Sequence, residues 1–314
     1  MKKSKNILFS FNLIINKAML FLRALFIIFL SSAVYAGDEK LVKKKLTDNF
    51  TSSLSSAVEN FLDGEGDTKV QINMGEDYKP EFSIVTVRPI SQHHSVDATF
   101  IQLQLNEQKI RGKGRISTNL GIGYRKLSDS KNSITGANVF LDYDEEGNAR
   151  ASIGLELRSS TFELLGNYYS GISGGQTVGA YTERTLDGTE VIAVGQVPYL
   201  PWVNIIGKHY EWQAEKNSKN SKGDKISLEM QLTPNLVVEL GYDDNNISGT
   251  DNFAKLMFVY PARESRPAAT TETISETAFV KSDMSLELLS IVRRTNKQII
   301  ESEGTGITIA RTSE

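Results

Sequence analysis

The sequence predicts an all-β protein: a transmembrane, antiparallel, up-and-down β-barrel of about twelve strands, preceded by a short helix. Apolar and polar residues alternate from Thr68 to Tyr260, which is the period of a β-strand with two different faces. The alternating segments run to about nine to eleven residues, the length that a tilted strand needs to cross a bilayer. Short and long connections take turns along the second half of the chain, as in a barrel with an even number of strands.

Length and composition leave room for this fold and narrow the alternatives. The chain has 314 residues, no Cys, 24 Gly and a formal net charge of -3. The absence of Cys excludes disulfides, thiol nucleophiles and thiolate metal sites. A nearly neutral chain lacks the excess of Lys and Arg with which proteins follow phosphate backbones, so we expect no nucleic-acid partner.

Residues 1–36 are predicted to be a signal peptide. An apolar run from Leu20 to Leu30, broken only by Arg23, precedes a small residue, Ala36, after which we expect cleavage. The basic residues before and beside this run are Lys2, Lys3, Lys5 and Lys17. A membrane-anchoring helix is the alternative, but the uninterrupted apolar stretch is shorter than the roughly 20 residues that span a bilayer.

Residues 37–66 are predicted to hold a periplasmic amphipathic helix. Its apolar residues recur mostly three or four positions apart, and Asp63 to Gly66 ends the pattern. Residues 67–260 then form the predicted barrel domain. Residues 261–314 begin with a stretch rich in Ala, Thr, Ser and Glu, which indicates a linker and the start of a truncated passenger.

The alternation is clearest between Ala149 and Arg158. Ile153 and Leu155 share an apolar face, whereas Arg150 and Glu156 share a polar one. The pattern recurs in residues 116–125, 226–232 and 236–243. A soluble β-sandwich alternates in the same way, so this pattern alone leaves both folds open.

Aromatic residues and loops favour the membrane barrel. Three long polar connections are expected at residues 171–188, 213–223 and 244–251, and short ones at 158–161, 198–202 and 233–235. The aromatic residues near strand ends, expected at the two membrane interfaces, are Tyr124, Tyr143, Tyr168, Tyr169, Tyr199, Trp202, Tyr210, Trp212, Tyr242 and Tyr260. In a soluble sandwich they would be ordinary packing aromatics.

Several motifs resemble the inverse autotransporter β-domain of intimins and invasins. The most specific are residues 119–125, which read Asn-Leu-Gly-Ile-Gly-Tyr-Arg, and residues 136–144, which read Gly-Ala-Asn-Val-Phe-Leu-Asp-Tyr-Asp. Weaker matches lie at residues 57–73, at 199–211 and at 289–300, in the order that the family shows. Together they cover roughly residues 50 to 300.

The resemblance implies a twelve-stranded barrel, insertion by the outer-membrane assembly machinery, and a C-terminal linker that passes through the lumen to display an adhesive passenger. A polar lumen would accommodate such a linker. The residues that we expect to face the lumen are Arg125, Asn138, Arg150, Glu156, Arg158, Glu229 and Glu239. The sequence departs from the family in having no peptidoglycan-binding module before the helix and no string of passenger repeats after residue 300.

No catalytic, cofactor or metal site is expected. Adjacent strand residues point to opposite faces, so His93 and His94 make a poor metal pair. Residues 142–147 begin like a calcium loop, but position twelve is Ile153 where that loop needs Glu. No Gly-Lys-Ser/Thr phosphate loop occurs, and the three histidines suggest no catalytic triad.

We therefore predict a non-enzymatic outer-membrane translocator and anchor, with its N-terminal segment in the periplasm. It would display a C-terminal segment at the cell surface in adhesion. The expected partners are outer-membrane lipid, the barrel assembly machinery, periplasmic chaperones and a receptor on a host or neighbouring cell. The alternatives are a barrel that binds surfaces through its own loops, a passive pore, and the remnant of a longer adhesin.

Overall fold

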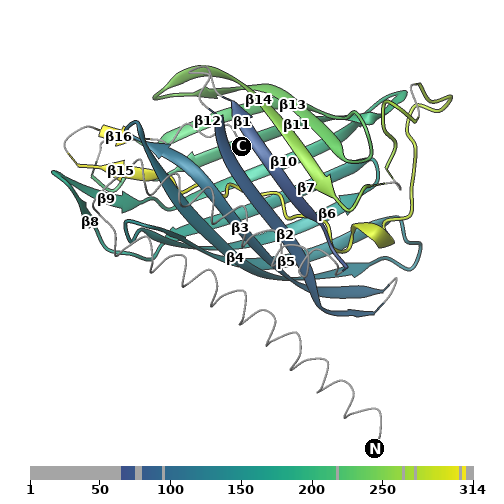
Figure 1. The fold of residues 1–314 in the computed structure, drawn as a ribbon, viewed down its shortest axis with the longest axis horizontal. Coiled ribbons are helices and arrows are strands. Elements are labelled where there is room, and N and C mark those ends of the chain that lie inside the picture. Colours follow the sequence, from purple (N-terminus) through teal and green to yellow (C-terminus); the bar gives the residue numbers. More distant parts are fainter. Residues whose placement is uncertain are drawn as a thin grey trace, which may run out of the picture. The chain divides into compact units, whose positions relative to one another are not determined.

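Twelve antiparallel strands close into a barrel in the computed structural model of the chain, which confirms the predicted fold class (Figure 1). The structure describes residues 65–74, 80–93, 96–216, 219–263, 266–271, 274–303 and 306–308. The predicted signal peptide, and the predicted helix up to residue 64, lie outside the described residues. The barrel strands are β1 (Thr68–Met74), β2 (Pro80–His93), β3 (Asp97–Ile110), β4 (Lys113–Leu127), β5 (Ser133–Asp144), β6 (Ala149–Ser159), β7 (Phe162–Gly171), β10 (Gly188–Val197), β11 (Leu200–Trp212), β12 (Ser221–Gln231), β13 (Leu236–Asn245) and β14 (Gly249–Tyr260).

The barrel closes where its first strand meets its last. β1 pairs with β14 from Thr68 opposite Tyr260 to Met74 opposite Ala254, and every other barrel strand pairs with its neighbour along the chain. Closure leaves no unpaired strand edge, which is the condition for a sheet to cross a membrane. The remaining strands, β8 (Gln176–Val178), β9 (Tyr181–Thr185), β15 (Ile300–Ser302) and β16 (Gly306–Thr308), form a separate four-stranded sheet in the order β16-β15-β9-β8.

The two ends of the barrel differ. At the end where β1 begins and β14 finishes, here called the turn end, strands are joined by short connections such as 160–161 and 198–199. The opposite end, here called the sheet end, carries the four-stranded sheet (Figure 1). Part of the predicted long connection 171–188 is the β8–β9 hairpin. The prediction of a long loop at 244–251 is wrong, because β13 and β14 continue their pairing to Asn245 opposite Gly249.

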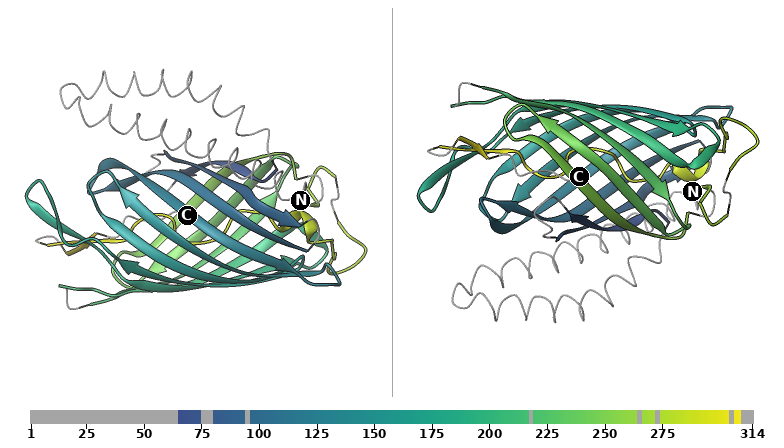
Figure 2. Two further views of the ribbon diagram at one scale, coloured as in Figure 1. Left: turned by 90° about the horizontal axis from the view of Figure 1, so that it is seen from below. Right: turned by 90° about the horizontal axis from the view of Figure 1, so that it is seen from above.

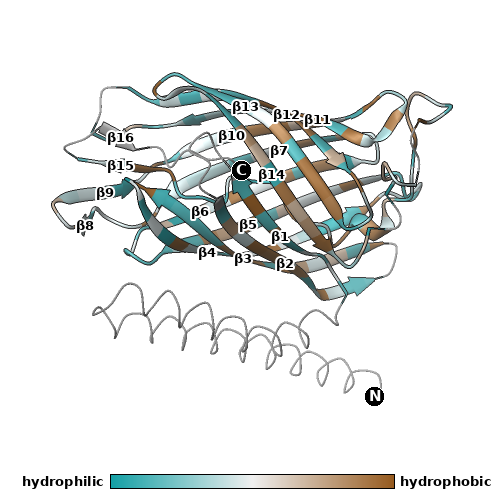
Figure 3. Ribbon diagram, turned by 45° about the horizontal axis from the view of Figure 1, so that its top comes forward, coloured by the Kyte–Doolittle hydropathy of each residue, from teal (hydrophilic) through white to brown (hydrophobic). Residues whose placement is uncertain are grey.

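The outer face of the wall is apolar and the inner face is polar. Ile153, Leu155 and Leu157 are 53%, 65% and 48% exposed, whereas Arg150 and Arg158 on the same strand are buried. Figure 3 shows the hydrophobic positions spread over the strands of the wall, with hydrophilic residues at β8 and β9. In a bilayer the exposed apolar side chains contact lipid, which is the usual arrangement of outer-membrane barrels.

Three of the ten aromatic residues assigned to the membrane interfaces are instead buried: Tyr169, Tyr210 and Trp212. Tyr168 is exposed, and its neighbour Tyr169 must therefore point inward, because successive strand residues face opposite sides. The rings of Tyr169 and Trp212 lie 5.1 Å apart between centroids. The interface prediction is wrong for these three residues.

Large inward-facing aromatic side chains lie against glycines on neighbouring strands. A Cβ atom on Gly121 would overlap the ring of Phe140, its partner across the β4–β5 ladder. Gly123 is related in the same way to Phe100, and Gly188 to Trp212. These pairs keep the rings flat on the wall, because a cross-strand glycine leaves room that any other residue would fill.

We predict that Gly121→Ala destabilises the barrel by about 1–3 kcal/mol, since the added methyl group forces the Phe140 ring away from the wall. Denaturant unfolding in detergent, followed by tryptophan fluorescence, measures the change. The matched control is Gly207→Ala on β11, where nothing lies within 4 Å of the added atom. Equal stabilities of the two variants would contradict the packing argument.

Candidate functional site

The C-terminal segment of residues 284–303, here called the threaded segment, runs through the barrel from the turn end to the sheet end (Figure 2). Its contacts follow the wall in order. Arg125, near the turn end of β4, donates to the carbonyl oxygen of Leu288 at 3.1 Å. Asn119 lies on the same face of β4, three side-chain positions closer to the sheet end, and donates to the carbonyl oxygen of Asn296 at 2.9 Å. Gln298 then reaches the backbone oxygen of Asn148, beyond the end of β5.

At the turn end the segment enters through a short 3-10 turn, Ser285–Glu287. The backbone N–H of Met284 donates to Lys131 in the β4–β5 connection at 2.9 Å. The Ser285 hydroxyl and backbone N–H both donate to Asp283, and these hydrogen bonds lower the pKa of its carboxyl group. The apolar side chains of the segment that pack with Phe100 and Phe140 of the wall are Met284, Leu288, Leu289, Ile291 and Val292.

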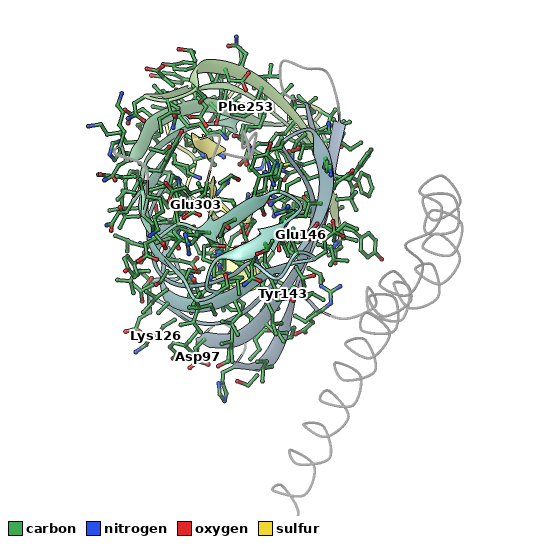
Figure 4. The ribbon with its side chains drawn as sticks, turned by 90° about the vertical axis from the view of Figure 1, so that its left-hand side faces the viewer. Asp97, Lys126, Tyr143, Glu146, Phe253 and Glu303 are labelled. Carbon is green, nitrogen blue, oxygen red and sulfur yellow. The ribbon has the colours of Figure 1, made fainter. Side chains whose placement is uncertain are left out.

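At the sheet end the segment becomes part of a sheet. The Ile299 carbonyl oxygen accepts from the Leu186 N–H at 2.9 Å, and β15 then pairs with β9. The Glu301 carboxylate accepts from the backbone N–H groups of Glu215 and Lys216 in the β11–β12 connection. Figure 4, viewed from this end, shows side chains filling the ring of strands and Glu303 inside its outline.

Arg294 is held on one side of the lumen. Its guanidinium makes two parallel bonds to Asp142 on β5, at 2.9 and 2.7 Å, and a third to the Ser152 hydroxyl at 3.0 Å. It also lies over the ring of Phe140, 4.3 Å from its centroid. Bidentate, charge-assisted bonds of this kind fix both distance and orientation.

Arg293, the preceding residue, is held on a different part of the wall. Its guanidinium makes two bonds to Glu229 on β12, at 2.9 and 2.7 Å, and one to Glu163 on β7 at 3.1 Å. In an extended chain adjacent side chains point in opposite directions, so this pair can contact two walls at once. The hydrogen bonds of Arg293 and Arg294 can therefore form only when the threaded segment has one particular position along the lumen.

Further polar contacts join the threaded segment to the wall between the turn end and the sheet end. Thr295 donates from its N–H and its hydroxyl to the two carboxylate oxygens of Glu190, at 2.9 and 2.6 Å. Lys297 forms an ion pair with Glu81. A cavity of about 130 Å³ remains beside the segment, and the unpaired polar atoms Ser83 Oγ and Gln104 Oε1 belong to residues that line it. Such a polar cavity has room for a few water molecules.

The structure buries all seven residues that were expected to face the lumen. Four of them contact the threaded segment: Arg125, Arg150, Arg158 and Glu229. The other three bond to neighbours on the wall. Glu156 accepts from Asn138 at 2.9 Å and also pairs with Arg125, and Glu239 accepts from Lys255 at 2.9 Å.

The sequence reading missed the acidic partners of the threaded segment. Asp142 was considered only within a family motif and as the start of a rejected calcium-loop pattern, but its side chain is buried between Arg150 and Arg294. The sequence did contain a signal that Asp142 faces the lumen. It lies four residues after Asn138, which was expected to face the lumen, and therefore shares its face of the strand. Arg293 and Arg294 were part of a motif match, without any role in the lumen.

No metal site is formed by the part of the chain that the structure describes: no three His, Asp or Glu side chains come together there. His93 bonds to Asp97 at 2.7 Å and His209 to Asp224 at 2.8 Å. Within the same residues, no helix is long and apolar enough to cross a membrane.

A closed wall with an apolar outside and a polar, threaded inside defines an outer-membrane barrel of the translocator class. The family model described as "Inverse autotransporter, beta-domain" matches residues 28–296. The chain belongs to this family, and it is an outer-membrane protein in contact with lipid. Proteins of this family and fold serve as membrane translocators and anchors and are typically not enzymes.

Among three similar solved structures, the one with a TM-score above 0.5 supports the fold and nothing beyond it. A structure described as "Unveiling the Mechanism Behind the in-meso Crystallization of Membrane Proteins" is similar to this chain with a TM-score of 0.59 and 19% identity, over 76% of this chain and 100% of that one. KdgM porin has a TM-score of 0.41 and 6% identity, over 61% and 98%. NanC porin has a TM-score of 0.42 and 10% identity, over 61% and 98%. No curated protein matches the chain.

Proposed function

We propose that the barrel anchors and exports the polypeptide that follows its threaded segment, and displays it at the cell surface in adhesion. The observation that carries this proposal is the direction of the threaded segment, which enters at the turn end and reaches the sheet end. The N-terminal strand begins at the turn end, so a periplasmic N-terminal segment would place the turn end in the periplasm and the sheet end outside.

The proposal includes the partners that such a barrel requires. Periplasmic chaperones and the barrel assembly machinery would deliver and insert it, and a receptor on another cell would bind what it displays. We also propose that the seven expected lumen residues form the polar lining through which the chain passes. A passive pore is less well supported, because the threaded segment is hydrogen-bonded to the wall near its entry, at its middle and near its exit.

The predicted topology can be tested with single cysteines, since the chain has none of its own. We expect Glu303→Cys to react with a membrane-impermeant maleimide in intact cells, because residue 303 would lie outside. Lys281→Cys, exposed at the opposite end, should react only after the outer membrane is permeabilised. Reaction of residue 281 in intact cells, with residue 303 protected, would reverse the orientation and reject the proposal.

A further inference from the structure

Two consecutive arginines connect the threaded segment to wall strands that are far apart around the barrel. Arg294 binds Asp142 on β5, and Arg293 binds Glu229 on β12 with two bonds and Glu163 on β7 with one. In the closed order, β12 and β5 are separated by β11, β10, β7 and β6 on one side and by six strands on the other. The two arginines therefore brace the segment across the lumen. We call this pair the arginine crossbar.

The crossbar is specific to one position of the segment along the barrel axis. Each arginine makes a two-bond contact with its carboxylate, and such a contact is lost when the chain moves by even one residue. A slip of two residues keeps the side chains on the same faces, as in any extended chain. It would carry both guanidinium groups about 7 Å from their carboxylates.

Other contacts in the lumen resist such a slip less strongly. The apolar side chains of residues 288–292 make contacts without direction, and backbone pairing at β15 can re-form after a shift of two residues. Leaving buried charges without partners in a packed lumen costs far more free energy than shifting these apolar and backbone contacts. Register is therefore controlled mainly by the charged side chains of the segment. These are Lys297, which pairs with Glu81, and the two arginines, which alone make two-bond contacts.

We propose that Arg293 and Arg294 are positioning residues that fix the register of the threaded segment, and so determine which residue first leaves the barrel. This inference rests on the proposed export function. It adds a point at which export stops: the chain would move no further once both guanidinium groups form ion pairs with their carboxylates.

The test measures whether the crossbar keeps the native register when the chain before the lumen is made two residues longer. The segment before the lumen is tied to the wall at the turn end, where Gln196 bonds to both backbone groups of Val280. Two extra residues, Ser-Gly, inserted between Lys281 and Ser282 must either bulge out at the turn end or push the segment forward by two positions. The two outcomes place different residues opposite Arg184 on β9.

Cross-linking distinguishes the two registers. Glu301 lies opposite Arg184 in the native pairing, and after a forward slip Ile299 would take that place. Cysteine pairs 184/301 and 184/299, joined by a short thiol-specific cross-linker, report the native and the slipped register in the whole inserted barrel. We expect the inserted chain to give the 184/301 product, with a yield within about twofold of the chain without the insertion.

Neutralising the crossbar should change this result. In the inserted chain, Arg293→Gln with Arg294→Gln should move the ratio of the two products toward 184/299 by at least about tenfold. Arg293→Lys with Arg294→Lys keeps both positive charges but loses the planar guanidinium that makes two bonds. This double variant should give an intermediate ratio of the two products. Arg263→Gln is the matched control, because Arg263 forms its ion pair with Asp67, outside the threaded segment.

Either of two results would overturn the inference: a slipped register in the inserted chain that keeps both arginines, or a native register in the double Gln variant. Heat-modifiable migration on gels shows which variants fold. If the double variant does not fold, the single Gln variants decide, and an unchanged ratio in both of them counts against the crossbar. Failure of the export proposal is seen separately, as a lack of surface labelling at residue 303 in the chain without the insertion.

Discussion

A chain that ends at Asp283 should form an open, water-filled pore, whereas the full chain should conduct little. Removal of the threaded segment empties the centre of the barrel, because Phe100 and Phe140 lie flat against glycines on the wall. Barrels with eight strands are filled by their own side chains and those with sixteen carry aqueous channels, so twelve strands without a plug leave space for ions. We expect conductance in planar bilayers to rise by at least about tenfold.

The barrel itself should survive this truncation. The carboxylates that bind the segment, such as Asp142 and Glu229, would be left facing water, and hydrated charges carry little penalty. A chain that ends at Glu303 is the control, since it keeps the threaded segment and should stay closed. Low conductance from a folded barrel that ends at Asp283 would mean that wall side chains alone close the lumen.

The barrel wall could be predicted from the sequence because the pattern that indicates it lies within each single strand. A strand between lipid and a polar lumen must alternate every second residue, and residues 149–158 show this without reference to any other part of the chain. The seven expected lumen residues came from this alternation. The same rule, applied strictly, would have turned Tyr169 inward, since Tyr168 faces out.

The threaded segment could not be predicted in this way. Residues 288–299 form a turn followed by irregular chain and bond to no neighbouring strand in a regular ladder, so no regular period marks them in the sequence. Their partners lie far away in sequence: Asp142 precedes Arg294 by 152 residues. The composition of residues 261–300 indicates a linker, and only the folded barrel shows which charges meet inside it. The loop at 244–251 was overestimated because its polar residues continue a strand pair beyond the apolar part of the wall.

Asp142 is the wall residue whose loss should cost most. Its carboxylate accepts from Arg150 at 2.8 Å, from Arg294 at 2.7 and 2.9 Å, and from Asn119 at 2.7 Å. Both guanidinium side chains are fully buried. Asp142→Asn keeps the shape but leaves two buried cations without a counter-charge, so we expect the free energy of unfolding to fall by about 3–5 kcal/mol.

The size of this loss should depend on the threaded segment. In the chain that ends at Asp283, Arg294 is absent and water reaches Arg150, so Asp142→Asn should cost less than about 1 kcal/mol. Asp224→Asn is the control in both lengths, because that carboxylate is 71% exposed. Unfolding by denaturant in detergent micelles, followed by tryptophan fluorescence, gives the four differences. An equal cost of Asp142→Asn in the long and the short chain would show that the stabilising partner of Asp142 is the wall alone, and that Arg294 contributes nothing to holding the segment in place.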